Sequence, residues 1–333
     1  MRDTGAASAT APARICLAGE SLDWMTGGTS VVAAIGLRTE VTATLNHHSR
    51  LVHLVAGAPL NTRRTVATHR LDQLTGDTLD YLQACAGGVM TDSAGGDLTS
   101  TTTVPVGAGV SSSAAVTVAA SAALLTAAEG VVPDVQRLTE LAYHAEATTG
   151  SGAGWMDFIA CAYGGLRRIE ATTPPATTLL APTLGTPVLL IDTQQRRSTS
   201  RVLRTKRTRL AEGEPRMIAY RDQAPSVVEA ITTALTAPRI DYEHLGTLIS
   251  QAHELLRRYM GCSTPLIDRC VTACLKAGAY GAKLTGSGHG GCLFALVSPE
   301  RMAAVVNAVA GLPVRPVVLT DTDSQGVQCT LLA

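Results

Sequence analysis

Residues 105–115 read Pro-Val-Gly-Ala-Gly-Val-Ser-Ser-Ser-Ala-Ala and continue into an apolar, alanine-rich run that reaches Ala128. Glycines and serines ahead of such a run predict a loop that leads into the N-terminus of a buried helix. Backbone N–H groups without intrahelical partners and the positive end of the helix dipole meet there, so the position suits a phosphate. The alternative is a serine N-cap on an ordinary core helix, which the same residues would also provide.

Two other stretches bear on this choice. A second Gly-rich loop reads Leu284-Thr-Gly-Ser-Gly-His-Gly-Gly-Cys292, and a polar cluster runs from Glu20 to Asp23, shortly after Arg14. A cation and two carboxylates near one strand end could bind a polyol and a phosphoryl group together, or form a surface group of salt bridges. The glycines of the second loop would let the backbone approach a ligand, with a plain strand turn as the alternative.

Composition limits the class of protein. The chain of 333 residues, 46% of them hydrophobic, has room for about two domains with full cores. Its formal net charge is +0, so a nucleic-acid partner is not expected. The eight cysteines include no Cys-x-x-Cys pair, which favours reduced thiols in a cytoplasmic protein over zinc or disulfides. Residues 1–13 do not resemble a signal peptide, and the run 114–128 is too short to span a bilayer, so no membrane association is expected.

Strand-like and helix-like segments follow one another along the chain. Strands are expected at residues 14–18, 36–45, 51–55, 99–104, 188–191, 283–285, 292–297 and 327–332. Helices are expected at residues 112–129, 133–148, 245–259, 265–275 and 303–310. The Pro/Thr/Ala-rich stretch 171–186 is the predicted linker between an N-terminal domain (1–175) and a C-terminal domain (186–333). This order predicts a mixed α+β fold and not a regular βαβ sheet.

Two more carboxylates and a basic run complete the candidate residues. Glu146 lies near the end of the helix expected at 133–148, and Asp157 follows the Gly-rich turn 150–154. A lone Asp after such a turn usually caps a helix, but inside a cleft it can orient or deprotonate a hydroxyl. His253 is interpreted as structural or solvent-facing. Seven basic residues crowd together at Arg196, Arg197, Arg201, Arg204, Lys206, Arg207 and Arg209. They could form a phosphate or nucleic-acid patch, but the balanced charge favours a solvated helix face near a cleft rim.

In this order, the segments resemble the GHMP kinase superfamily of galactokinase, homoserine kinase, mevalonate kinase and phosphomevalonate kinase. Residues 11–24 look like the galactokinase N-terminal signature, and residues 105–115 look like the family's phosphate loop. Gly154-Trp-Met-Asp157 looks like the galactokinase segment with the catalytic Asp, and residues 253–292 end in the third family motif. Residues 191–201 look more like mevalonate kinase. The resemblance implies a two-domain α+β GHMP kinase fold with its active site in the cleft between the domains.

The resemblance also implies a role for each motif residue, with ATP and Mg²⁺ as cofactors. Asp157 would orient or deprotonate the acceptor hydroxyl, and Arg14 would lie beside that hydroxyl and the γ-phosphate. Mg²⁺ would be held by Glu146 and by Ser112 or Ser113. The ATP phosphates would be bound by Pro105, Gly107, Ala108, Gly109, Val110, Ser111, Ser112, Ser113 and Ala114. The acceptor would be bound by Glu20, Ser21, Asp23, Gly286, Ser287 and Gly288.

Several positions depart from the patterns of these kinases. Ser21 and Leu22 stand where galactokinases have His and Thr, Phe158 stands where Gln or Asn usually follows the catalytic Asp, and Arg14 replaces the Lys of mevalonate kinase. We therefore expect an ATP-dependent kinase of a sugar-like polyol or cyclitol, present as a monomer or homodimer. A kinase of a hydroxy acid, or a decarboxylase of the same superfamily, is the alternative enzyme. A sensor that binds ATP and ligand without turnover is the alternative outside the enzymes.

Overall fold

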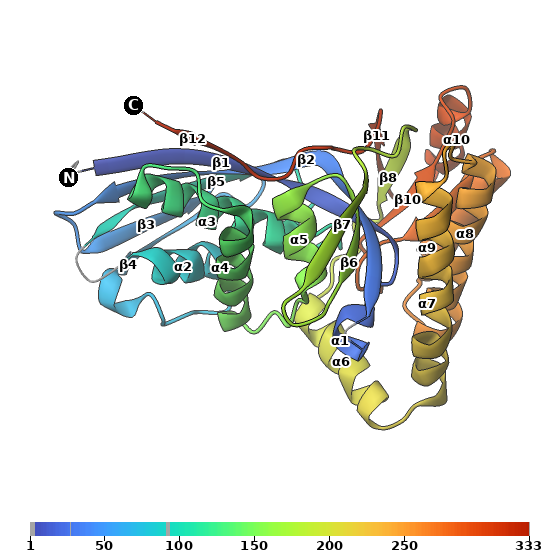
Figure 1. Cartoon of the computed structure of the whole chain (residues 1–333), viewed down its shortest axis with the longest axis horizontal. Helices are drawn as coiled ribbons and strands as arrows, with labels where there is room; N and C mark the ends of the chain where they lie inside the picture. Colours follow the sequence, from blue (N-terminus) through green and yellow to red (C-terminus); the bar gives the residue numbers. More distant parts are fainter. Residues whose placement is uncertain (1–3, 27, 91–93, 333) are drawn as a thin grey trace.

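The computed structural model describes residues 4–26, 28–90 and 94–332, and it contains two sheets with helices around them (Figure 1). The larger, eight-stranded sheet has the order β12-β1-β2-β5-β3-β4, with β6 paired to β2 and β7 paired to β6. Its strands are β1 (Thr4–Ala18), β2 (Thr29–Asn46), β3 (Leu51–Ala56), β4 (Thr62–Ala67), β5 (Gly95–Thr102), β6 (Leu166–Glu170), β7 (Ala176–Ala181) and β12 (Gln328–Leu331). The four-stranded sheet has the order β11-β8-β10-β9, from β8 (Val188–Asp192), β9 (Gly281–Leu284), β10 (Cys292–Leu296) and β11 (Arg315–Leu319).

The helices divide between the two sheets. One group gathers beneath the larger sheet in Figure 1: α2 (Asp80–Val89), α3 (Ser112–Glu129), α4 (Val135–Thr148) and α5 (Trp155–Tyr163). A second group lies at the other end of the molecule: α7 (Pro215–Thr236), α8 (Tyr242–Leu255), α9 (Pro265–Lys276) and α10 (Met302–Val309). The short α1 (Leu22–Thr26) and the basic α6 (Thr199–Ala211) lie between these groups. The expected α+β fold is confirmed.

Helix α3 is the centre of the N-terminal half. It packs against β1, β2, α2 and α4, and its side chains are buried on almost every face. Of the helices in the described residues, α3 is the one long and apolar enough to cross a membrane, but 72% of it is buried inside the protein. Its many alanines allow the close approach of neighbouring elements that such burial requires. We therefore interpret α3 as a core helix.

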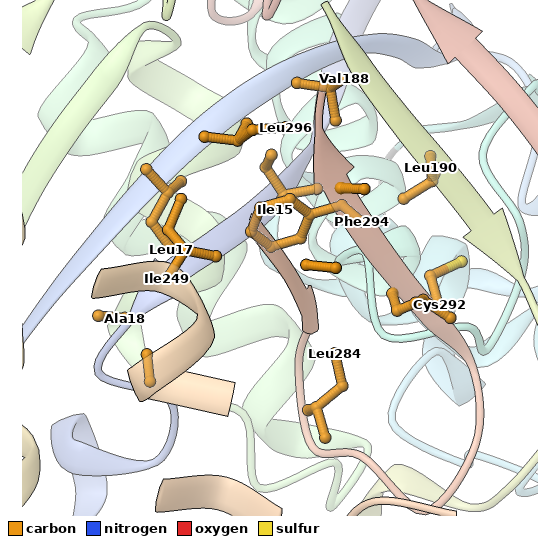
Figure 2. Close-up of a cluster of buried hydrophobic side chains, with 14 of the residues drawn as sticks. Ile15, Leu17, Ala18, Val188, Leu190, Ile249, Leu284, Cys292, Phe294 and Leu296 are labelled. Carbon is orange, nitrogen blue, oxygen red and sulfur yellow. The ribbon is translucent and has the colours of Figure 1, made fainter. Parts of the chain in front are cut away.

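The end of β1 is buried in the core of the C-terminal half. Ile15, Leu17 and Ala18 pack against Phe294 of β10 and Ile249 of α8 (Figure 2). These side chains are almost fully inaccessible to solvent, so the position of β1 relative to the small sheet is fixed by apolar packing. The polar residues around β1, from Arg14 to Asp23, are therefore held at the junction between the two halves.

The helices expected from the serine loop and from Pro265 begin at the expected residues, and Asp134 caps α4 by accepting from the N–H groups of Gln136 and Arg137. Other elements differ from expectation: β1 and β2 are longer than predicted, and strands β4, β6, β7 and β11 and helices α2 and α7 were not predicted. Two strands bear on the division into domains. Strand β7 lies within the predicted linker, and β12, from the predicted C-terminal domain, pairs antiparallel with β1 in the larger sheet. Whether β7 forms a strand, and which sheet β12 joins, depends on pairing with strands that are distant in sequence. A short run of apolar residues does not indicate its pairing partner. The division into 1–175 and 186–333 remains a prediction.

Candidate active site

A cavity of about 560 Å³ lies where the two halves meet. Thirteen of the predicted site residues line it: Arg14, Glu20, Ser21, Asp23, Gly107, Gly109, Ser111, Ser112, Ser113, Glu146, Asp157, Gly286 and Ser287. Five do not line it: Pro105, Ala108, Val110, Ala114 and Gly288. The side chains of Ala108, Val110 and Ala114 are buried in the core, where apolar packing outweighs exposure to a ligand. These three residues therefore anchor the loop and the start of α3 in the core and do not face the cavity.

Arg14 of β1 and Asp157 of α5 form an ion pair in the cavity. The Nε and Nη2 atoms of Arg14 donate to Asp157 Oδ1 at 2.9 and 2.6 Å, and Nη1 donates to the Gly109 carbonyl at 2.7 Å. Burial opposes the charge of Arg14, but the negative charge of Asp157, its hydrogen bond and smaller effects of nearby groups together outweigh burial, so the pKa of Arg14 is raised. Gly154 is the N-cap residue of α5, and within the described ranges the side chain of Asp157 accepts hydrogen bonds from Arg14 and from no backbone N–H of the first turn. The capping interpretation of Asp157 is therefore wrong.

Asp23 of α1 places a second carboxylate beside Asp157. Burial and the charge of Asp157 raise the pKa of Asp23 to about 6. A Cβ atom at Gly154 would overlap the Asp23 carboxylate, so the approach of α1 to the start of α5 requires glycine there. Ser21, with φ 71°, also lines this end of the cavity and is buried. One arginine and two carboxylates thus meet at one end of the cavity.

The loop of residues 105–111 leaves the first turn of α3 without a side-chain cap among the described residues. Ser111 precedes α3 with φ 63° and makes no capping hydrogen bond, and its buried Oγ has no partner among the described residues. Ser112 Oγ accepts instead from the Gly107 N–H at 3.1 Å. The interpretation of this loop as an ordinary serine N-cap is therefore wrong. A Cβ at Gly109 would lie 2.7 Å from the Thr285 carbonyl, so the two Gly-rich loops pack against each other.

Two family models match the chain. The N-terminal domain of GHMP kinases matches residues 73–165, and the C-terminal model of GHMP kinases matches residues 227–312. The chain belongs to the GHMP kinase superfamily. The predicted family is thereby confirmed, and its members use ATP.

Relatives of this GHMP kinase include mevalonate kinases and galactokinases. It is 28% identical to the mevalonate kinase of Thermococcus sibiricus, over 92% of this chain and 94% of the relative. It is 26% identical to the galactokinase of Mycobacterium bovis, over 90% of this chain and 91% of the relative. These relatives indicate a small-molecule kinase of the sugar or hydroxy-acid kind, as expected.

Two solved structures share the fold of this GHMP kinase. Lactococcus lactis galactokinase in complex with galactose aligns with a TM-score of 0.82 at 20% identity, covering 97% of this chain and 95% of the other. A mevalonate kinase crystal structure aligns with a TM-score of 0.77 at 20% identity, covering 95% and 99%. The two-domain GHMP kinase fold is confirmed.

Glu20 of this GHMP kinase is committed to a buried ion pair. Lys283 of β9 donates to Glu20 Oε1 and to the carbonyls of Cys16 and Leu284. The hydroxyl of Tyr220 donates to the Glu20 carbonyl at 2.7 Å. Glu20 Oε2 is buried and has no partner among the described residues. One oxygen of Glu20 therefore ties the turn between β1 and α1 to the small sheet, and the other remains for the predicted contact with an acceptor.

Two residues of the basic run point inward. Arg197 donates from Nε to the Gly288 carbonyl at 2.8 Å and from Nη1 to the Gly107 carbonyl at 3.0 Å, so it joins the two Gly-rich loops. Its Nη2 is buried without a partner among the described residues. Lys206 is 1% exposed and donates to the Ser287 carbonyl at 2.8 Å. The solvated-face interpretation is therefore wrong for these two residues.

The spacing of residues along α6 could have distinguished the buried Lys206 from the exposed basic residues. Arg201 and Arg204 are exposed on α6, as expected for a solvated face. Lys206 follows the buried Leu203 by three residues, which places both on one side of α6. That spacing could have separated Lys206 from its neighbours, but Arg197 precedes the helix and gives no periodic signal.

Glu146 of α4 is a buried acid whose side chain faces hydroxyl groups. Burial, reinforced by the charge of Asp157, raises the pKa of Glu146 to about 7, against the opposing effect of the hydroxyls of Ser113, Ser151 and Thr117. No cluster of three or more His, Cys, Asp or Glu side chains suited to a metal occurs among the described residues. One carboxylate, Glu146, with the nearby hydroxyl of Ser113 fits Mg²⁺, because this ion commonly binds to one or two carboxylates and completes its shell with phosphate oxygens and water.

His253 of α8 is part of the core of this GHMP kinase. It is buried, and its Nδ1 accepts from the Leu284 N–H at 3.4 Å. Burial and the charge of Lys283 lower the pKa of His253 to about 4, so the ring is neutral at pH 7. The structural interpretation of His253 holds, and the solvent-facing one is wrong.

Proposed function

We propose that this GHMP kinase transfers the γ-phosphate of ATP, with Mg²⁺, to a hydroxyl group of a sugar-like polyol. The observation that carries the proposal is the pair of carboxylates at the acceptor end, Asp23 and Asp157, with Arg14 already bound to Asp157. Hydroxyl groups can donate to both carboxylates. An acceptor with a carboxylate of its own would meet two negative charges there and would need a cation that is not yet paired.

Each end of the cavity has its part in the transfer. Asp157 would accept the proton of the attacking hydroxyl at Oδ2, while Arg14 holds Asp157 in place and offsets charge on the transferred phosphoryl group. The open first turn of α3 would donate backbone N–H groups to the phosphates, and Arg197 Nη2 would add a charged donor. Bound Mg²⁺, held by Glu146 and Ser113, would neutralise phosphate charge.

A hydroxy-acid kinase is the second candidate. The mevalonate kinase relatives support it, and so does Arg197, whose buried Nη2 could bind a carboxylate instead of a phosphate. A non-catalytic sensor is less well supported, because Arg14, Glu146 and Asp157 are all present and all line the same cavity.

A coupled ADP-release assay separates these candidates. The purified protein is tested with ATP and Mg²⁺ against monosaccharides, aminosugars, cyclitols, mevalonate and homoserine, and phosphorus NMR locates the phosphate in any product. The Asp157→Asn variant serves as the control for contaminating kinases. Turnover of a polyol supports the proposal, and turnover of mevalonate alone overturns it. Binding of ATP with no turnover of any compound would favour the sensor.

A further inference from the structure

The acceptor end of the cavity has an outer wall that involves α6. Ser200 and Leu203 line the cavity, and Arg207 follows Leu203 by four residues, so it lies on the same side of the helix, one turn further on. Arg207 has no role in the proposed phosphoryl transfer. Its guanidinium extends toward two segments of the N-terminal half.

The first of these segments is α1. The guanidinium carbon of Arg207 lies 5.5 Å from the centre of the Trp24 ring, in the range of a cation–π contact. Trp24 lines the cavity next to Asp23, and its Nε1 is buried without a partner among the described residues. An indole with an apolar face and an unpaired N–H suits a sugar-like ring, which offers C–H groups and hydroxyls together.

The second segment is the turn before α5. Arg207 Nη2 donates to the Gly152 carbonyl at 2.9 Å. Gly152 has φ +71°, and a Cβ there would lie 2.9 Å from Arg207 Nη1, so glycine allows both the turn and the close approach. Three glycines in residues 150–154 make this turn flexible, and Asp157 lies three residues after Gly154. A contact from α6 restricts the turn from outside.

We propose that Arg207 is a positioning residue for acceptor recognition: it holds Trp24 and the Gly152 turn together as the outer wall of the acceptor end. We expect the wall to control affinity for the acceptor more than affinity for ATP, because the hydrogen bond and the cation–π contact of Arg207 go to Gly152 and Trp24 and not to the loop of residues 105–111. The class of acceptor rests on the proposed function, but the contact between Arg207 and Trp24 does not.

Fluorescence quenching tests the wall without an acceptor. Trp24 and Trp155 are the two tryptophans of the chain, so Trp155→Phe leaves Trp24 as the only indole. In that background we expect Arg207→Ala to increase the quenching of Trp24 fluorescence by acrylamide. Arg204→Ala should leave this quenching unchanged. Arg204 is a matched control on the same helix, exposed and without a hydrogen bond or ion pair among the described residues. Equal quenching in the Arg207→Ala and Arg204→Ala proteins would overturn the proposal.

Kinetics then test the role in recognition, with D-galactose and mevalonate as the probe acceptors. For whichever probe is phosphorylated, Arg207→Ala should raise the acceptor KM about fivefold and change the ATP KM little, with partial rescue by Arg207→Lys. A parallel rise in the ATP KM would also overturn the proposal, since it would indicate a general structural defect. Turnover of mevalonate alone, with Trp24 still responding to Arg207→Ala, would refute the polyol proposal and leave the wall intact.

Discussion

Arg14 holds Asp157 by one oxygen only. Both side-chain hydrogen bonds from Arg14 end on Oδ1, and among the described residues no hydrogen bond reaches Oδ2. The third donor of Arg14 goes to the carbonyl of Gly109, so the same guanidinium joins the loop of residues 105–111 to the helix that carries Asp157. The carboxylate is therefore fixed in orientation and still has an oxygen to accept a proton from a bound hydroxyl.

Asp157→Asn should lower kcat by more than about 10²-fold, because an amide oxygen can still accept from Arg14 but the side chain cannot take up the proton of the acceptor. Nucleotide affinity should stay within a factor of about 2, since the phosphate loop is unchanged. Steady-state kinetics and titration with a fluorescent ATP analogue measure the two effects. A variant with normal kcat would remove Asp157 from proton transfer.

Glu146→Gln should raise the Mg²⁺ concentration needed for half-maximal activity. The amide keeps the size of the side chain but removes the negative charge that would attract the ion. Activity is measured against free Mg²⁺ at a fixed, saturating ATP concentration. An unchanged Mg²⁺ dependence would show that Glu146 is not a ligand.

The same substitution should change how stability depends on pH. The pKa of Glu146 is raised from its ordinary value of 4.5 to about 7, so ionisation is disfavoured in the folded protein. The ligand-free protein should lose stability as pH rises from 4.5 to 7, by on the order of 3 kcal/mol, and no more above that. Urea unfolding in EDTA at pH 5 and pH 8 measures this loss, which should be smaller in Glu146→Gln. An equal loss in both proteins would assign it to other groups.

Gly154→Ala should destabilise the protein by about 1–3 kcal/mol, because its Cβ would overlap the Asp23 carboxylate. The backbone at Gly154, with φ −94°, accepts alanine without strain, so the clash is the main effect. In an Asp23→Ala background the same change should be nearly neutral. Urea unfolding of the four proteins of this double-mutant cycle tests the point, and equal costs in both backgrounds would contradict it.

Trp155→Ala should lower both kcat and stability, whereas Trp155→Phe should be tolerated. Trp155 stacks on Tyr143 with ring centres 3.8 Å apart, and this contact ties α5, which carries Asp157, to α4, which carries Glu146. Loss of the stacked pair should cost about 2 kcal/mol. Kinetics and urea unfolding check both effects. Normal kcat in the alanine variant would show that the stack does not position the two carboxylates.

The local parts of the fold could be predicted from the sequence. The alanine-rich run and Gly130, which ends α3 with φ +72°, gave both ends of that helix. The gathering of Arg14, Glu146 and Asp157 in one cavity was expected from the family resemblance. Arg197 and the Glu20–Lys283 pair were missed, because a side chain buried by a distant segment leaves no periodic signal in the neighbouring sequence. Lys206 was missed although its spacing from Leu203 was such a signal.

Strand β12 adds a consequence for synthesis and truncation. Residues 328–331 close the edge of the larger sheet along β1, although every other strand of that sheet lies before residue 182. During translation, one edge of β1 stays unpaired until almost all of the C-terminal half has been synthesised. A fragment of residues 1–175 would keep that edge open permanently, and open edges recruit strands from neighbouring chains. Expressed alone, the N-terminal half should aggregate, and a peptide covering residues 327–332 should slow its aggregation.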